Sequence, residues 1–137
     1  MPVPRGNYIP ATRSGPTIRT AGMTPRRAGQ LTVVGRVGAD VDLDTAYAAA
    51  ALAVTNAIAA ARSMLAPTER LEIMEMTVYI ACEPNFTRLS AVADGASDTL
   101  SQMADDVALP ARSAVGVYAL PDGAPVEVAL VAEAVPR

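Results

Sequence analysis

An alanine-rich segment in the first half of the chain limits the fold more than any other feature. Asp42-Leu43-Asp44 supplies N-cap side chains and negative charge for a helix start, and Pro67 ends the segment. The pattern predicts a helix over Thr45–Leu65. Because alanine lies on nearly all of its sides, this helix can pack close to a β-sheet. Its apolar run, Ala46–Ala61, is too short and too weakly apolar to span a membrane, which takes about 20 apolar residues.

Runs rich in β-branched and aromatic residues predict short strands around this helix. The predicted strands are Asn7–Thr12, Thr17–Thr20, Gln30–Val34, Leu71–Cys82, Arg112–Leu120 and Pro125–Ala134. A second helix is predicted to start at Glu83-Pro84-Asn85 and to end near Asp106, because apolar residues recur there at helical spacing. The last two strands are predicted to form a hairpin around Pro121-Asp122-Gly123.

The predicted element order is β-β-β-α-β-α-β-β, with no sign of an internal linker. It implies one α+β domain over residues 1–137, with a mixed sheet and two helices on one of its faces. The other face then needs a cover. Because many strand residues are apolar, we expect another subunit to cover it.

Missing residue types exclude several common catalytic designs. The chain has no histidine, and all 11 of its basic residues are arginine. It therefore lacks a histidine base, a histidine-ligated metal and a lysine for a Schiff base or pyridoxal phosphate. Cys82 is the single cysteine, which excludes an intrachain disulfide, and it is expected to be a small buried apolar residue. We expect neither a metal nor a cofactor.

Charge and leader signals point to no macromolecular partner. The formal net charge of -3 is too small to indicate nucleic-acid binding, and Arg26-Arg27 is interpreted as part of a solvated loop. The N-terminus lacks the apolar segment of a signal peptide. We therefore expect a cytoplasmic protein with neither a membrane nor a nucleic acid as partner.

Arg112 and Glu127 are the strongest candidates for chemistry. They stand in two apolar, strand-like runs joined by the predicted turn. In a hairpin centred on Asp122, Arg112 would face residue 132 and Glu127 would face residue 117, a separation of about 16 Å along the strand. One chain then cannot bring both groups to one small substrate. If the two groups cooperate, they must meet across a subunit interface.

Short motifs, taken together in their order and spacing, resemble those of the RidA family. This family is also called YjgF-like and has long been labelled endoribonuclease L-PSP. The motifs are Gly6-Asn7-Tyr8, Thr20-Ala21-Gly22-Met23-Thr24-Pro25, Pro110-Ala111-Arg112-Ser113 and Pro125-Val126-Glu127-Val128. The segment Asp94-Gly95-Ala96-Ser97-Asp98 resembles the branch described as chorismate-mutase-like, a name that concerns the fold.

The resemblance covers essentially the whole chain and implies a chorismate-mutase-like (RidA) fold and a homotrimer with clefts between its subunits. It also implies hydrolysis of enamines and imines, such as 2-aminoacrylate, to 2-keto acids and ammonia. Arg112 matches the family arginine that binds the substrate carboxylate, which suits the bidentate geometry of a guanidinium. Glu127 matches the family glutamate that orients or activates water. The alternatives are a structural salt bridge at a trimer contact for Arg112 and an edge-strand charge that prevents aggregation for Glu127.

The resemblance implies five further substrate contacts. Tyr8 matches a tyrosine that closes over the ligand, although packing explains this residue equally well. Gly22 and the backbone N–H of Ala114 match other ligand contacts. Ala21 stands where deaminases often have serine, Ala114 where many have cysteine, and Ser90 near a position often held by asparagine. These departures remove polar side chains and leave the substrate, and activity itself, open.

Two alternatives to a general enamine/imine hydrolase therefore remain. One is a non-catalytic trimer that binds a small carboxylate as a sensor or partner module. The other is a pathway-specific enzyme of the same fold. No nuclease site is recognisable in the sequence to support the endoribonuclease label.

Overall fold

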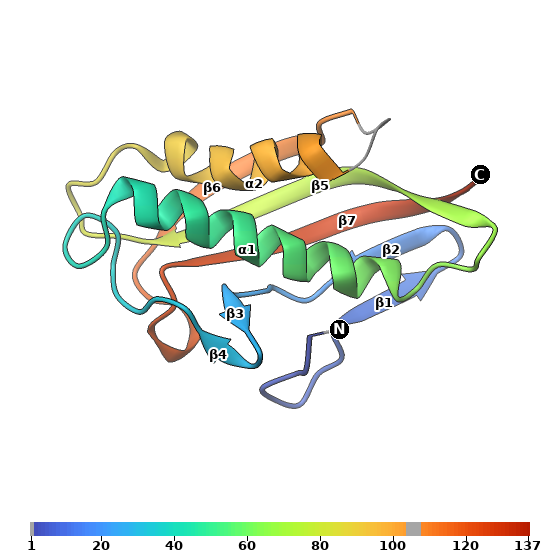
Figure 1. Ribbon diagram of the computed structural model, residues 1–137, viewed down its shortest axis with the longest axis horizontal. Helices are drawn as coiled ribbons and strands as arrows, with labels where there is room; N and C mark the ends of the chain where they lie inside the picture. Colours follow the sequence, from blue (N-terminus) through green and yellow to red (C-terminus); the bar gives the residue numbers. More distant parts are fainter. Residues whose placement is uncertain (1, 104–107) are drawn as a thin grey trace.

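The computed structural model of this chain describes residues 2–103 and 108–137, and Figure 1 shows its elements. The strands before the first helix are β1 (Ala11–Ser14), β2 (Thr17–Thr20), β3 (Arg26–Arg27) and β4 (Gln30–Leu31). The later elements are α1 (Leu43–Arg62), β5 (Glu69–Ala81), α2 (Leu89–Met103), β6 (Ala111–Val117), a 3₁₀ turn (Pro121–Gly123) and β7 (Val126–Pro136). The predicted order is confirmed, except that the small β3–β4 hairpin replaces the third strand.

The main sheet has the strand order β1-β2-β7-β5-β6. β6 runs parallel to β5, whereas the other neighbouring pairs are antiparallel, which confirms the predicted mixed sheet. The predicted hairpin between the last two strands is wrong. β5 lies between β6 and β7, and its Tyr79 pairs with Val115 on one side and with Glu127 on the other. A turn does form at residues 121–123, between β6 and β7, as predicted. A turn does not decide, however, whether the two strands that flank it pair with each other.

The crossover between β5 and β6 explains this topology. A parallel strand pair needs a long connection, and α2 supplies it. The chain then crosses from β6 to the far edge of β5, where β7 pairs along the length of β5 and is also joined to β2. β6 is therefore an edge strand, and β7 lies inside the sheet.

Both helices cover the same face of the sheet, as predicted (Figure 1). α1 packs over β7 and β2, while α2 packs against β6 and β5. The residues of β7 that face the helices, such as Val126, Val128 and Leu130, are buried at every second position. Neither helix covers the opposite face, where Glu127 and Val131 lie.

Small residues allow the two helices to approach each other closely. A Cβ atom at Gly95 of α2 would lie 2.9 Å from the carbonyl carbon of Tyr47 of α1. On α1, the buried positions are mostly alanine, such as Ala46, Ala50 and Ala53. The alanine-rich sequence therefore forms a core helix, as expected. By length and composition α1 could also cross a membrane, but its buried residues pack against the sheet and α2.

The helix ends differ from the prediction by a few residues. α1 starts at Leu43, because the Asp42 carboxylate accepts a hydrogen bond from the Thr45 N–H at 2.8 Å and is the N-cap. α2 starts at Leu89, because the residues predicted to open it instead form a loop in which the Phe86 N–H donates to the Glu83 carbonyl. The predicted end of α2 near Asp106 lies outside the described residues.

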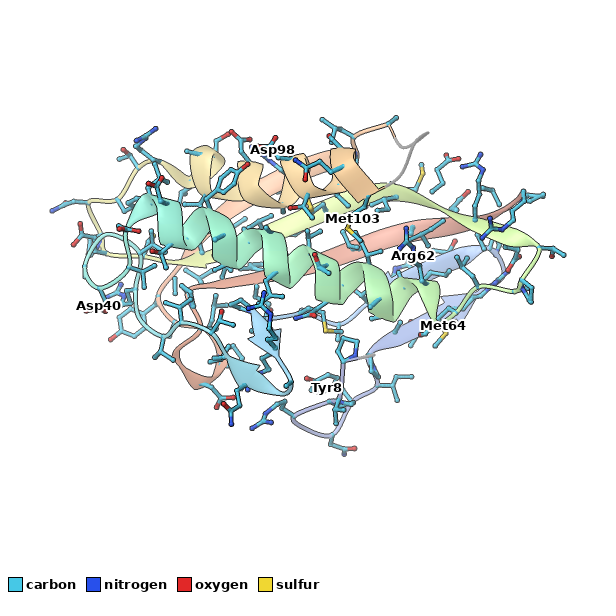
Figure 2. The ribbon with its side chains drawn as sticks, viewed as in Figure 1. Tyr8, Asp40, Arg62, Met64, Asp98 and Met103 are labelled. Atoms are coloured by element: carbon cyan, nitrogen blue, oxygen red, sulfur yellow. The ribbon has the colours of Figure 1, made fainter. Side chains whose placement is uncertain are left out.

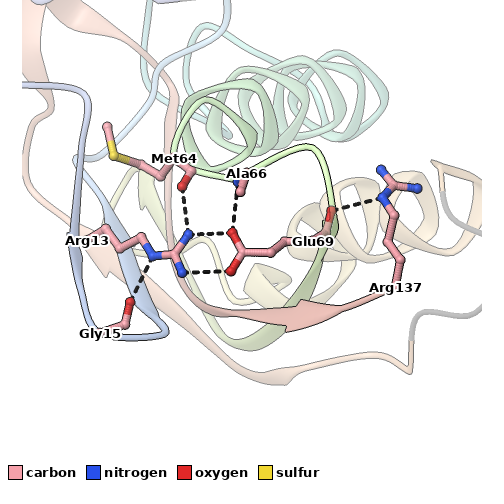
Figure 3. Close-up of polar contacts among 6 residues, drawn as sticks. All are labelled: Arg13, Gly15, Met64, Ala66, Glu69 and Arg137. Atoms are coloured by element: carbon pink, nitrogen blue, oxygen red, sulfur yellow. Dashed lines mark hydrogen bonds and ion pairs between the residues drawn. The ribbon is translucent and has the colours of Figure 1, made fainter.

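The ion pair between Arg13 and Glu69 and the hydrogen bonds around it connect four segments at one end of the sheet (Figure 3). The Arg13 guanidinium donates to both carboxylate oxygens of Glu69, at 2.7 and 2.8 Å, and also to the Met64 carbonyl at 2.9 Å. The Ala66 N–H donates to the same carboxylate at 2.8 Å, and Arg137 Nε donates to the Glu69 carbonyl at 3.0 Å. These bonds connect β1, the end of α1, the start of β5 and the C-terminus. The hydrogen bond from Arg13 is the main cause that lowers the pKa of Glu69 to about 2.

Candidate functional site

Arg112 lies on the edge strand β6 and reaches toward α2. Its Nη1 donates to Asp94 Oδ1 at 2.8 Å and to Ser97 Oγ at 3.0 Å, and its Nη2 donates to Ser90 Oγ at 2.7 Å. The three partners stand at positions i, i+4 and i+7 of α2, so they share the helix face toward β6. Arg112 therefore connects the edge strand to the helix that covers it.

Two of the predicted substrate contacts belong to this Arg112 cluster. Ser90 is directly bonded to the guanidinium. Ala114 follows Arg112 by two residues, so its side chain lies on the same face of β6, where it packs against the core. The predicted salt-bridge alternative for Arg112 is thus realised within one chain, through Asp94, rather than requiring a trimer contact.

Glu127 lies on the opposite face of the sheet. It stands between the buried residues Val126 and Val128 of β7, and its own side chain is half-buried. Burial raises the pKa of this carboxyl above its ordinary value of 4.5. Because β7 is inside the sheet, the expectation of an edge-strand charge that prevents aggregation does not describe Glu127.

Gly22 packs directly against the Glu127 carboxylate. A Cβ atom at position 22 would lie 2.5 Å from Glu127 Cδ and closer still to Oε2, so only glycine leaves room for this side chain. Two backbone hydrogen bonds of 2.8 Å between Met23 and Val128 hold the segment in place. The structure thus brings together Gly22 and Glu127, two residues that the sequence predicts to act in one site.

Tyr8 and Gly22 also line a cleft of about 520 Å³ between the N-terminal segment, the 22–29 segment and α1. Two arginines, Arg5 and Arg26, contribute to its walls. The Asn56 amide of α1 donates to the carbonyls of Thr24 and Arg26 at 3.1 and 3.0 Å, which fixes the wall opposite the N-terminal segment.

The predicted site residues therefore fall into two groups. Ala21 sits one residue before Gly22, packed against the core, and joins the group of Tyr8, Gly22 and Glu127. Ser90 and Ala114 join Arg112. Figure 2 shows Tyr8 and the α2 residue Asp98 at opposite sides of the molecule.

The strand register separates Arg112 from Glu127. Arg112 pairs with Met76 of β5, whereas Glu127 pairs with Tyr79, three residues further along that strand. This offset is about 10 Å along the strands, with two strand spacings, about 10 Å, across them. The predicted five-residue offset is wrong because the two strands do not pair. One chain still does not bring Arg112 and Glu127 to one small substrate, because the two side chains also point to opposite faces of the sheet.

Asp94 and Ser97 are partners of Arg112 that the sequence reasoning missed. Asp94 pairs with Arg112, and Asp98 of the same helix accepts a hydrogen bond from the Tyr47 hydroxyl, which raises the pKa of Tyr47. The spacing of Ser90, Asp94 and Ser97 on one helix face is a signal that could have revealed the cluster.

Comparisons with known proteins cover nearly the full length. The family model for endoribonuclease L-PSP matches residues 1–134. Protein TCP17 of Trypanosoma cruzi is 33% identical over 127 residues, which make up 91% of this chain and 79% of that protein.

Two solved structures share the fold. The protein Atu1372 of Agrobacterium tumefaciens, of unknown function, aligns with a TM-score of 0.84 and 32% identity over 93% of this chain and 83% of its own. The YjgF gene product of E. coli aligns with a TM-score of 0.66 and 24% identity over 96% of this chain and 91% of its own. Together with the family match, these similarities show that the chain belongs to the endoribonuclease L-PSP family, also known as the YjgF/RidA family.

Proposed function

We propose that the protein is an enamine/imine hydrolase that converts intermediates of the 2-aminoacrylate type to 2-keto acids and ammonia in the cytoplasm. Arg112 binds the substrate carboxylate and Glu127 positions the attacking water. The residues proposed to line the site are Tyr8, Ala21, Gly22, Ser90 and Ala114. The reaction needs neither a metal nor a cofactor, because the imine carbon is already electrophilic.

The surroundings of Glu127 carry this proposal. Its carboxyl group is half-buried beside Gly22, and burial raises its pKa. No ion pair joins it to another described residue. A carboxyl group with a raised pKa and no cation to neutralise it is suited to accept a proton and to return it.

The proposed reaction uses this proton twice. The species that reacts is the imine tautomer of the substrate. Glu127 accepts a proton from water as the water oxygen forms a bond to the imine carbon, and it passes this proton to the imine nitrogen, which gives a neutral tetrahedral intermediate. Glu127 then accepts the proton of the new hydroxyl group and returns it to the nitrogen. The C–N bond breaks, ammonia leaves, and the carbon–oxygen double bond of the keto acid forms. Meanwhile a guanidinium can hold the substrate carboxylate through two parallel hydrogen bonds.

A homotrimer would unite the two groups of site residues. Arg112 lies on an edge strand, and Glu127 lies on a sheet face that neither helix covers. That face carries apolar residues, among them Val131 and the exposed Val115, which favours contact with a second copy of the chain. Light scattering of the purified protein tests this step. We expect a trimer that Val131→Glu dissociates and that Val34→Glu, at an exposed site outside the main sheet, leaves intact; a wild-type monomer would contradict it.

The activity test generates 2-aminoacrylate in solution and measures keto-acid release. We expect the wild-type protein to accelerate release, and Arg112→Ala and Glu127→Ala each to lower kcat/KM by about 100-fold or more. Arg62→Ala, at an exposed position of α1, is the matched control for loss of an arginine. A wild-type protein that does not accelerate release contradicts the proposed reaction.

The Arg112–Asp94 ion pair favours one second candidate, a trimer that binds a small carboxylate without turnover. Arg112 already has a carboxylate partner in its own chain, and the side chains of Ala21 and Ala114 are methyl groups without a polar atom for a ligand. Under this candidate, pyruvate raises the melting temperature of the protein while 2-aminoacrylate is not consumed faster than in buffer.

A further inference from the structure

The charge of Arg112 is partly neutralised by its own chain. Asp94 Oδ1 accepts from Nη1 at 2.8 Å, and the side chains of Arg112 and Asp94 are 21% and 54% exposed. Ser97 Oγ accepts from the same Nη1, at 3.0 Å. Both N–H groups of Nη1 are thus engaged by α2. Nη2 in turn donates to Ser90 Oγ at 2.7 Å and to the Ser90 carbonyl at 3.5 Å. A substrate carboxylate would have to bind through Nε or displace one of these α2 groups, such as Asp94.

We propose that Asp94 sets how tightly Arg112 binds a carboxylate, by acting as an internal counter-ion. This inference rests on the role proposed above for Arg112. A second carboxylate on the same guanidinium comes within a few ångströms of Asp94, and the two negative charges repel each other. For partly exposed charges at such a distance, the repulsion weakens binding by about three- to tenfold.

Weakened binding has a chemical use in the proposed reaction. The substrate and the keto-acid product carry the same carboxylate, so a guanidinium with undiminished charge would also retain the product. Asp94 lowers the affinity for both without removing the hydrogen-bond geometry. Ser90 and Ser97 are neutral, so they orient the guanidinium without opposing an anion. Asp94 is therefore a positioning residue that also determines affinity.

The chain offers a matched set of variants. Asp94→Asn keeps an oxygen that can accept from Nη1 and removes the negative charge. Asp94→Ser removes the charge with a shorter side chain and serves if the first variant does not fold. Ser97→Ala removes a neutral hydrogen bond to the same nitrogen and leaves the charge unchanged. Arg112→Ala removes the guanidinium itself.

The experiment measures the dissociation constant of pyruvate by calorimetry at low and at moderate ionic strength. We expect Asp94→Asn to bind pyruvate about three- to tenfold more tightly than wild type, with a difference that shrinks as salt is added. Ser97→Ala should stay within about twofold of wild type, because a neutral bond changes no charge. In an Arg112→Ala background, Asp94→Asn should bring no gain.

Unchanged or weaker binding by the neutral Asp94 variants overturns the inference, as does a gain that survives Arg112→Ala. The absence of pyruvate binding in wild type and in both neutral variants overturns it as well. Turnover of 2-aminoacrylate is measured separately. If pyruvate binds through Arg112 but 2-aminoacrylate is not turned over, the proposed reaction is contradicted and the inference about Asp94 stands. If 2-aminoacrylate is turned over but Asp94→Asn changes neither pyruvate binding nor KM, the inference about Asp94 is contradicted and the proposed reaction stands.

Discussion

Glu127 lies against Gly22 so closely that a Cβ atom at position 22 would come within 2.5 Å of Glu127 Cδ. The two residues are distant in the sequence, and the backbone bonds between Met23 and Val128 bring them together. Position 22 therefore requires glycine, because any larger residue would occupy the space of the half-buried Glu127 carboxylate. It also allows the position of that carboxylate to be tested with a single methyl group.

Gly22→Ala is expected to displace the Glu127 side chain. The added methyl group should lower the free energy of unfolding by about 1–3 kcal/mol, since overpacking forces neighbouring groups to move. It should also lower any hydrolase activity by about tenfold or more, because the carboxylate leaves its working position. Thermal melting and keto-acid release measure the two effects. In a Glu127→Ala background the methyl group finds room, so equal destabilisation in both backgrounds would contradict the contact.

Glu127→Gln is expected to stabilise the protein at neutral pH. Burial raises the pKa of the folded-state carboxyl above 4.5, so the folded state binds a proton more readily than the unfolded chain. Wild-type stability from this group is then fully present below pH 4.5 and is lost as the pH rises through the raised pKa. Melting temperatures of both proteins should converge at low pH and separate above it. A constant difference across this range would show that the pKa is not raised.

Glu69 should give the opposite pH dependence. Its pKa is lowered to about 2 by Arg13 and by the Ala66 N–H, so its stabilising effect is present above pH 4.5 and is lost as the pH falls toward 2. Glu69→Gln should lower the melting temperature at pH 7 and have less effect at pH 3. Glu72→Gln is the control, because Glu72 lies on the same strand with a single 4.0 Å contact to Arg70. Equal behaviour of the two variants would contradict the role of the Arg13–Glu69 pair.

Gly95→Ala is expected to separate the two helices. The new Cβ atom would meet the backbone carbonyl of Tyr47, which cannot rotate away as a side chain can. We expect a loss of about 1–3 kcal/mol in the free energy of unfolding, measured by denaturant titration. Ser101→Ala, at an exposed position of α2, should change it by less than about 0.5 kcal/mol. A Gly95→Ala protein as stable as wild type would mean that α2 shifts along α1 without cost.

The fold was largely predictable wherever local patterns act alone. The Asp42 cap and the alanine run determine α1, because capping and helix propensity depend on residues near each other in the chain. The long strand β5 follows from its β-branched residues. The start of α2 was misplaced, because the residues before Leu89 contain helix-start signals that a loop also accepts.

The site was predictable in its residues and less so in its contacts. Motif order in the sequence singled out Arg112, Glu127 and Gly22, and the structure places the last two together. The partners of Arg112 on α2 were missed, because the pairing of a strand with its covering helix depends on the sheet topology.

The sequence by itself determined the element order, the core helix and the charged residues available for chemistry. Each of these depends on side chains within a few residues of one another. Only the tertiary structure decided that β5 separates β6 from β7, and that Arg112 and Glu127 pair with positions 76 and 79 of β5. Strand order is a choice among long-range pairings whose burial is similar, and a turn between two strands does not make that choice.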